Sequence, residues 1–349
     1  MRALVLGSGG SQPTPKAGCT CRVCTRARLE GGHNARSGPS LWLPDYGVLI
    51  DTPEESNAQL NAAGILELKA VLFSHFHPDH TAGVRVVEYI ARWGAPGVPT
   101  FMPQDLELSL EQVSLFRFQR DMKHLEVRHT VDREAFTLGE LRVTPLRHRS
   151  DMPMYSYLFE DSNGRGLYNS DHFITLDLDG LRDLDWAMVQ VGLMPDGVQE
   201  RSLPPDHPAR KVLVPIPRVC EMAAQRGWKR LVFTHLYEAI RLHPEEYDDL
   251  ARKLENQYGL EVAFAFDGMM LSPSENIGVS SLEISTTETS KPVPLESQTT
   301  EALLERLRQK REAIEREFRN DRPRMRQVMR ELMHAPEQRE LERRSSKRD

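Results

Sequence analysis

The sequence predicts a layered α/β protein, and three observations support that prediction. Short apolar runs of strand length alternate with segments of helical periodicity, as in a sheet covered by helices. Several of these runs are almost entirely apolar, which is typical of strands that are covered on both faces. With 349 residues, the chain is long enough for one large domain and an appendage.

The expected elements follow from these patterns. Nine apolar runs are predicted to be strands: Arg2–Leu6, Val48–Asp51, Ala70–Ser74, Leu141–Leu146, Tyr155–Phe159, Gly166–Asn169, Trp186–Val191, Arg230–Thr234 and Glu261–Phe266. Four segments are predicted to be helices: Glu54–Ala63, Thr81–Arg92, Pro217–Arg226 and Pro244–Tyr258. Gly227 follows the third helix and is expected to end it.

The character of the chain changes after Leu271, so residues 1–271 are predicted to be the main domain. Residues 272–300 are rich in Ser, Thr, Pro and Glu, and are predicted to be a linker. Residues 301–349 are predicted to be a charged helical extension with two apolar stripes. The stripes consist of Leu303, Leu304, Leu307, Ile314 and Phe318, and of Met325, Val328, Met329, Leu332 and Met333. They favour packing on the main domain, with a docking or dimerisation arm as the alternative.

The charge distribution argues against nucleic-acid binding. The chain has a net charge of −6, and residues 301–349 carry 15 basic and 11 acidic residues, which leaves the remainder clearly acidic. Basic and acidic residues are interleaved in the extension, which is unlike a nucleic-acid-binding arm. Without an apolar run long enough for a membrane span or a signal peptide, a cytoplasmic protein is expected.

Three of the four cysteines, Cys19, Cys21 and Cys24, lie close together in the sequence. In a reducing compartment, such crowding indicates metal ligation more than a disulfide framework. The fourth, Cys220, lies in a helical apolar pattern and is expected to be a small buried hydrophobic residue.

The segment from Phe73 to His80 has the highest density of metal-ligand side chains. It follows an apolar strand and contains His75, His77, Asp79 and His80. Imidazole and carboxylate suit Zn²⁺ and related divalent ions. His75 and His77 alternate and can point to one side, whereas Asp79 and His80 begin the next loop and can reach a second ion. The spacing therefore predicts a metal centre.

This segment resembles the His-x-His-x-Asp-His hallmark of the metallo-β-lactamase superfamily, and the resemblance covers roughly residues 1–271. It implies an αβ/βα sandwich of two mixed sheets flanked by helices, followed by the helical extension. It also implies one metal ion on His75, His77 and His148, a second on Asp79, His80 and His235, and Asp171 as the bridge. His148, Asp171 and His235 each follow a predicted strand.

Asp51, at the end of the strand Val48–Asp51, also matches a superfamily position. It is interpreted either as a residue that orients the metal ligands or as the cap of a turn.

The N-terminal motif indicates a narrower family. Gly7–Ser11, Pro15 and Gly18–Cys24 look like the phosphoribosyl 1,2-cyclic phosphate phosphodiesterase family of phosphonate degradation, as does Phe266–Met269. That resemblance implies a structural zinc on Cys19, Cys21 and Cys24. The family has a histidine as fourth ligand where this chain has Glu238, so the fourth ligand stays open, with His33 another candidate.

A second departure from the family concerns the proton donor. Relatives have a histidine near the position where this chain has Val212–Ile216. His207, a few residues upstream, and His172, beside Asp171, are the two replacements considered. Each, taken alone, also fits a histidine that faces solvent.

The resemblance implies a binuclear phosphodiesterase that uses zinc or manganese and acts on a small cyclic phosphate or nucleotide-like phosphodiester. Five neutral imidazoles and two carboxylates would leave net positive charge on two ions, which suits a phosphate. The alternatives are a tRNA 3′-end nuclease, a thioester hydrolase, a pyrroloquinoline quinone biosynthesis B-like protein and a non-enzymatic metal-binding scaffold. A small phosphodiester is the expected partner, and a homodimer is a further hypothesis.

Overall fold

The computed structural model describes residues 1–91, 96–113, 115–195, 206, 210, 213–237, 240 and 242–272. All of them belong to one compact unit, Met1–Leu282. The predicted extension, and the predicted linker apart from Ser272, lie outside the described residues and stay predictions. Within the described part of the chain, no helix has the length and apolar character needed to cross a membrane.

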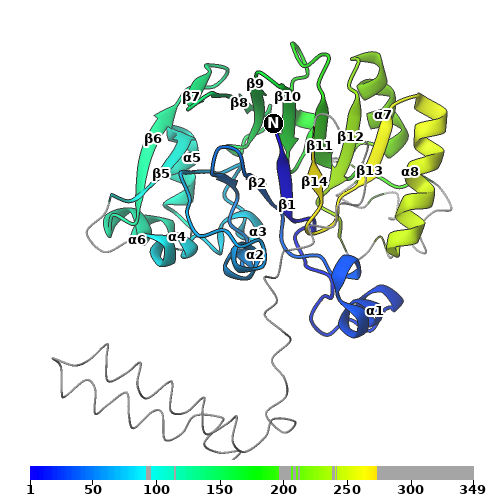
Figure 1. Ribbon diagram of the computed structural model, residues 1–349, viewed down its shortest axis with the longest axis horizontal. Helices are drawn as coiled ribbons and strands as arrows, with labels where there is room; N and C mark the ends of the chain where they lie inside the picture. Colours follow the sequence, from blue (N-terminus) through cyan, green and yellow to red (C-terminus); the bar gives the residue numbers. More distant parts are fainter. Residues whose placement is uncertain are drawn as a thin grey trace, which may run out of the picture. The chain divides into compact units, whose positions relative to one another are not determined.

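The first of two seven-stranded sheets is built from strands of the N-terminal half of the domain together with the C-terminal strand β14 (Figure 1). Its strand order is β14-β1-β2-β3-β4-β5-β6. The bounds are β1 Ala3–Gly7, β2 Ser40–Leu43, β3 Val48–Ile50, β4 Ala70–Leu72, β5 Val98–Pro103, β6 Leu125–Thr130 and β14 Met270–Leu271. Strands β3 to β6 are parallel, whereas β14, β1, β2 and β3 pair antiparallel. The sheet is therefore mixed.

The second sheet has the order β13-β12-β11-β10-β9-β8-β7. Its strands are β7 Phe136–Leu138, β8 Leu141–Arg147, β9 Tyr155–Asp161, β10 Gly164–Asn169, β11 Trp186–Gln190, β12 Arg230–Thr234 and β13 Glu261–Phe264. Strands β10 to β13 are parallel and β7 to β10 antiparallel. Two mixed sheets with helices outside them confirm the predicted αβ/βα sandwich.

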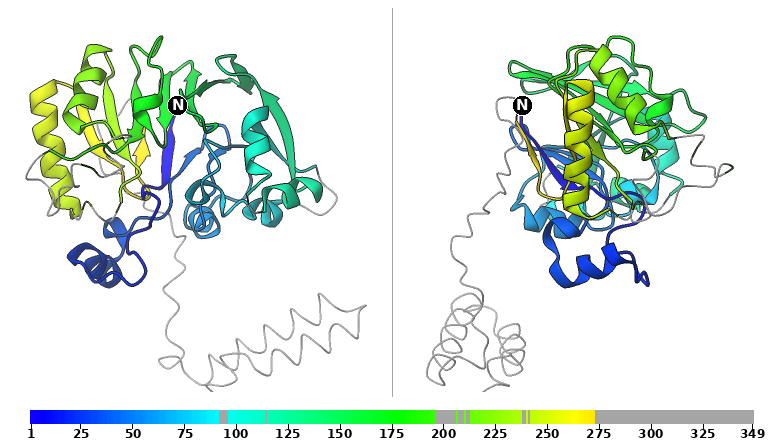
Figure 2. Two further views of the ribbon diagram at one scale, coloured as in Figure 1. Left: turned by 180° about the vertical axis from the view of Figure 1, so that it is seen from behind. Right: turned by 90° about the vertical axis from the view of Figure 1, so that its right-hand side faces the viewer.

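The helices of the described residues are α1 Arg22–Glu30, α2 Ser56–Ala62, α3 Pro78–Thr81, α4 Val86–Ile90, α5 Gln104–Leu110, α6 Phe116–Asp121, α7 Ile216–Gln225 and α8 Pro244–Tyr258, with 3₁₀ turns η1 Gly32–Asn34 and η2 Phe173–Thr175. Helix α1 lies away from both sheets, at the end of the domain (Figure 1). Helices α7 and α8 pack against the second sheet, whereas α2 and α4–α6 flank the first (Figure 2). Gly227, with φ of 70°, follows α7 as predicted.

Strand β11 shows why an unbroken apolar run identifies a central strand. Trp186 and Met188 belong to the core between the sheets, and Ala187 and Val189 pack in the cluster formed with α7 and α8. Both faces of the strand are therefore covered, and its first four residues are all apolar. Next to it, Gly166 leaves room for the Trp186 ring, because a Cβ there would lie 2.1 Å from Trp186 Cε2.

The predicted helix Thr81–Arg92 was only partly right, because the structure divides it into α3 and α4; Arg92 lies outside the described residues. Gly83 lies between the two helices, and its N–H donates to the Thr52 carbonyl at 2.9 Å. A Cβ at Gly83 would lie 1.8 Å from the Pro53 carbonyl oxygen. This close backbone contact interrupts the helix and holds the segment that carries Asp79 and His80 against the end of β3.

Candidate metal centre

The predicted metal ligands meet where several strands end. The segment Phe73–His77 follows β4 and leads into α3, Asp171 follows β10, and His235 follows β12. Two groups of side chains have ligand atoms within 4.8 Å of one another: His75, His80 and Asp171, and Asp79, His80 and His235. The structure thus brings together five of the seven predicted ligands from three separate parts of the chain.

His77 joins this cluster through His75. The Nε2 atom of His75 lies 3.0 Å from His77 Nδ1 and 3.7 Å from Asp171 Oδ2. Burial lowers the pKa of both His75 and His77, so both rings are neutral near pH 7. Neutral imidazoles with converging nitrogens are the form in which histidine binds a metal ion.

His80 provides the test of whether a cation fits. Its Nδ1 lies 2.8 Å from Asp51 Oδ2, while its Nε2 is buried, lies 3.4 Å from Asp79 Oδ2 and makes no geometrically good hydrogen bond to any described residue. A buried polar atom without a partner is destabilising and needs an explanation. A divalent cation between His80, Asp79 and His235 explains it, so the donor set fits a metal ion.

The charges around His80 are consistent with a cation site. Although burial opposes it, the carboxylates of Asp51 and Asp79 raise the pKa of His80 to about 10. Burial likewise opposes ionisation of Asp79, but hydrogen bonding to His235, with Nε2 3.2 Å from Asp79 Oδ2, lowers the pKa of that carboxyl. The site therefore favours positive charge beside ionised carboxylates.

Asp51 contacts the predicted ligand His80, as the first of its two interpretations expects. Its carboxylate accepts hydrogen bonds from the Ser74 N–H and hydroxyl, both at 2.7 Å, and contacts His80 Nδ1. Its backbone adopts a φ of 61° at the end of β3. Asp51 fixes the His80 ring so that Nε2 points to the other ligands.

We expect Asp51→Asn to weaken metal binding about 10- to 100-fold, the usual effect of removing a hydrogen-bond partner behind a metal ligand. The amide cannot accept from both Ser74 groups and His80 as the carboxylate does. A competition titration with a metal chelator measures the affinity. Asp45→Asn, which removes a carboxylate in an exposed ion pair with Arg2, is the control and should leave the affinity unchanged. Equal affinities in the two variants would contradict the orienting role.

The Asp171 carboxylate accepts a hydrogen bond from Gln190, a residue that the sequence analysis did not identify. One carboxylate oxygen, Oδ1, accepts hydrogen bonds from the His172 N–H at 2.9 Å and from Gln190 Nε2, while Oδ2 faces His75. Gln190 is the last residue of β11. The available signal was a single amide side chain at the end of an otherwise apolar strand.

His148 follows β8 as predicted, but its nitrogens do not join the cluster. The side chain is buried, with Nδ1 2.9 Å from Thr175 Oγ1 and Nε2 2.8 Å from Ser156 Oγ. Burial lowers its pKa to about 4, so the ring is neutral. Both ring nitrogens thus have hydroxyl partners, and ligation by His148 stays a prediction.

Of the two proton-donor candidates, His172 lies beside the cluster. Its Nε2 is 3.8 Å from Asp171 Oδ2, and its side chain is 23% exposed. A φ of 48° at His172 turns the chain sharply after Asp171. His207 lies outside the described residues.

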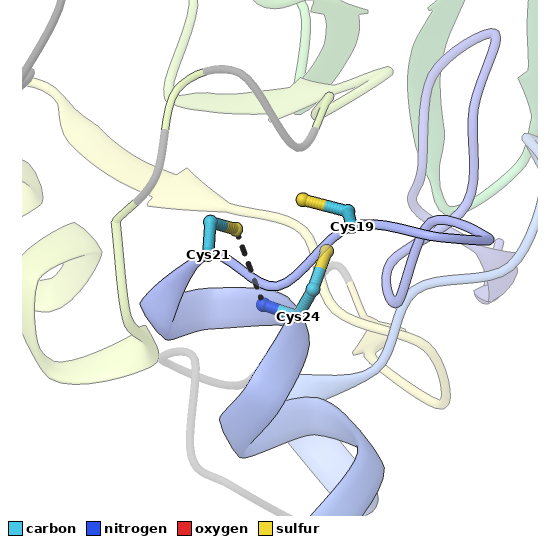
Figure 3. Close-up of side chains that lie close together, drawn as sticks. All are labelled: Cys19, Cys21 and Cys24. Carbon is cyan, nitrogen blue, oxygen red and sulfur yellow. Dashed lines mark hydrogen bonds between the residues drawn. The ribbon is translucent and has the colours of Figure 1, made fainter.

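The three neighbouring cysteines form a second cluster, with their sulfurs pointing toward one another (Figure 3). The sulfurs of Cys19, Cys21 and Cys24 lie within 4.8 Å of one another. The Cys24 N–H points to Cys21 Sγ at 3.5 Å, and the Lys16 N–H points to Cys24 Sγ at 3.3 Å. Burial and the neighbouring sulfurs raise the pKa of Cys24 to about 12, so three thiolates need a cation to form together.

This thiol cluster therefore fits zinc, which prefers thiolates. Of its two predicted fourth ligands, Glu238 lies outside the described residues. His33 is exposed, and its ring lies 4.0 Å from that of Phe266. Cys220 is fully buried in α7, as predicted, and burial raises its pKa to about 12.

Comparisons with known proteins agree with the fold and with the superfamily resemblance. Residues 46–236, more than half of the chain, match the family model described as a beta-lactamase superfamily domain. An octanoyltransferase from Porphyromonas gingivalis is 26% identical over 287 residues, which cover 79% of this chain and 54% of the relative. The chain thus spans about half the length of that relative.

Solved structures share the fold at low sequence identity. A diphosphatase of the PhnP family is 24% identical, with a TM-score of 0.60, over 78% of this chain and 97% of its own. Zn²⁺-bound PqqB from Methylobacterium extorquens is 18% identical, with a TM-score of 0.62, over 78% and 100%. The short form of human tRNase Z is 17% identical, with a TM-score of 0.51, over 79% and 100%. At these identities the likeness establishes the fold alone.

Proposed function

Because the chain belongs to the metallo-β-lactamase superfamily, we propose that it is a binuclear metal-dependent phosphodiesterase. The proposed substrate is a small cyclic phosphate or a nucleotide-like phosphodiester. The observation that carries the proposal is the buried cluster of imidazoles and carboxylates, with His80 Nε2 left without a hydrogen-bond partner among the described residues.

The ligand residues would hold two divalent cations, zinc or manganese. When bound, such cations supply Lewis acidity and a water molecule of lowered pKa. His75, His77 and His148 are proposed for one ion, Asp79, His80 and His235 for the other, and Asp171 for both. Lowered pKa values at His75, His77 and His148 keep these imidazoles uncharged, so their charge does not hinder cation binding.

The choice of a phosphate ester rests on charge. Among the seven proposed ligands only Asp79 and Asp171 carry negative charge, so two divalent cations would exceed the ligand charge. A site with net positive charge attracts an anionic substrate. His172, beside Asp171 and partly exposed, is proposed to give a proton to the leaving group, with His207 as the alternative.

We further propose that the thiol cluster holds a structural zinc. Such a zinc would stabilise the N-terminal segment around α1, because folding brings the three sulfurs together. A homodimer formed by the extension and a cytoplasmic location stay predictions, as does the assignment of residues 272–300 as a linker.

A thioester hydrolase is the second candidate, because the relative from Porphyromonas gingivalis is named an octanoyltransferase. That name applies to a protein about half of which the chain matches, so it makes an acyl substrate worth testing. The same metal cluster would serve either reaction, since a carbonyl and a phosphoryl oxygen are both polarised by a Lewis acid.

Metal content and substrate turnover test the proposal together. We expect about three divalent ions per chain in elemental analysis, two from the buried cluster and one from the thiol cluster. A panel of cyclic ribose phosphate, 2′,3′-cyclic nucleotides, bis-p-nitrophenyl phosphate and a thioester should give phosphodiester turnover that a chelator abolishes. Turnover of the thioester alone would overturn the substrate class, and one ion or fewer per chain would overturn the binuclear site.

A further inference from the structure

Among the described residues, the proposed zinc on the thiol cluster has three ligand atoms close together, whereas structural zinc sites almost always have four ligands. Water as the fourth ligand would leave the position open, which is a feature of catalytic zinc sites. A closed site therefore needs one more side chain from this region of the domain.

We infer that His243 is the fourth ligand and that the site is of the Cys₃His type. The inference rests on the zinc proposed for the thiol cluster. The first observation is an unused donor: His243 Nδ1 is buried and has no hydrogen-bond partner among the described residues. A buried imidazole nitrogen needs a partner, and a cation on the thiol cluster would supply one.

The second observation is the clamp that joins the cysteine helix to the start of α8. Arg22, which directly follows Cys21, donates from Nη2 to Glu246 Oε1 at 2.9 Å and Oε2 at 2.8 Å. Glu246 Oε2 also accepts the His243 N–H at 2.7 Å. One carboxylate oxygen thus links the backbone of His243 to the residue beside Cys21. Arg26, one turn further along α1, pairs with Glu245 at 2.5 Å.

The neighbouring carboxylates are not candidates for the fourth zinc ligand, because both take part in the clamp. Glu245 and Glu246 are held by Arg26 and Arg22, whereas the His243 ring has no such commitment at Nδ1. The backbone of His243 already serves the helix: its carbonyl accepts the Glu246 N–H at 3.0 Å. The His243 side chain also takes the N-cap position of a capping box with Glu246, and the Glu246 N–H keeps its carbonyl partner if the ring turns toward a metal ion.

His243 is not among the side chains whose ligand atoms lie within 4.8 Å of all three sulfurs. Ligation therefore requires a movement of the His243 side chain, while the clamp keeps its backbone near α1. Three thiolates, one imidazole and Zn²⁺ carry a net charge of about −1 by simple charge counting. The nearby guanidinium groups of Arg22 and Arg26 are already paired with Glu246 and Glu245, so they leave that charge largely in place.

The test compares His243→Ala with His33→Ala and Cys21→Ser in the full chain. Zinc per chain, chelator competition and melting temperature are measured without reference to activity. We expect His243→Ala to bind the thiol-cluster zinc at least about 100-fold more weakly and to melt at a lower temperature, because losing a ligand exceeds the usual loss from an outer partner. His33→Ala should match the unmodified protein.

The two proposals fail in different ways. Unchanged zinc content in Cys21→Ser would overturn the zinc proposed for the thiol cluster. Loss of one zinc in Cys21→Ser, with unchanged zinc affinity in His243→Ala, would overturn only the assignment of His243.

A second variant keeps the inference testable if His243→Ala does not fold. His243→Cys offers a fourth thiolate, which zinc accepts as readily as imidazole. In the cobalt-substituted protein, we expect this variant to gain thiolate-to-metal charge-transfer absorption relative to the unmodified chain. An unchanged cobalt spectrum would show that position 243 does not reach the metal and would overturn the assignment.

Discussion

Asp171→Ala is expected to lower kcat by roughly 10³-fold or more, the scale of losing a metal-activated nucleophile and its charge stabilisation. Asp171 Oδ2 faces His75, while Oδ1 is fixed by Gln190 and by the backbone of His172. The carboxylate is thus oriented from behind and has one oxygen directed into the metal-ligand cluster. Alanine removes the proposed bridge and leaves the Gln190 amide without its partner.

Steady-state kinetics and metal content of the same preparations measure this effect. Asp179→Ala is the matched control, because Asp179 lies further along the same loop and is exposed. It should retain both metal content and kcat. If Asp171→Ala kept full activity on every substrate of the panel, Asp171 would have no place in the metal centre.

The central strands of this fold could be predicted because a strand that is covered on both faces appears in the sequence as an apolar run. Each of the nine predicted runs overlaps a strand, including β11, whose residues are buried on both faces. Strand β6, by contrast, lies at the edge of the first sheet and alternates buried with exposed positions irregularly. Its strand conformation comes from parallel pairing with β5, which is a long-range interaction that local patterning does not contain.

Helix α1 was missed for a related reason. Only Val23, Cys24 and Ala27 are buried among its nine residues, so it lacks a wide apolar stripe. Cys21 precedes its first turn, and the ion pairs of Arg22 and Arg26 connect it to α8. Those partners are more than 200 residues away in the sequence, and single-sequence patterns do not reveal them.

The predicted metal ligands differ in the same way in how far local sequence reveals them. His75, His77, Asp79 and His80 form a local motif, and the order of the later ligands could be taken from a family resemblance. The residues that hydrogen-bond to His148 and Asp171 could not be predicted. Ser156, Thr175 and Gln190 come from β9, η2 and β11, and they reach these side chains only in the folded chain. Hydroxyl and amide side chains are common throughout a protein, so the sequence alone does not indicate which of them contact a predicted metal ligand.

The proton donor is the remaining assignment, and we expect leaving-group dependence to identify it. His172→Asn removes the imidazole while keeping a residue that tolerates the left-handed backbone at this position. If His172 is the donor, kcat on a natural cyclic phosphate should fall about 10²- to 10⁴-fold, because an alkoxide needs a proton to leave. On bis-p-nitrophenyl phosphate the change should be small, since p-nitrophenolate is a stable leaving group.

His207→Ala is the matched comparison, because it removes the other candidate. The donor is the histidine whose loss harms the alkoxide substrate far more than the p-nitrophenyl ester. An equal loss on both substrates in His172→Asn would instead show damage to the neighbouring Asp171, whose Oδ1 accepts the His172 N–H. The metal content of His172→Asn separates these two causes, because a proton donor can be removed without loss of metal, whereas a displaced Asp171 cannot hold both ions.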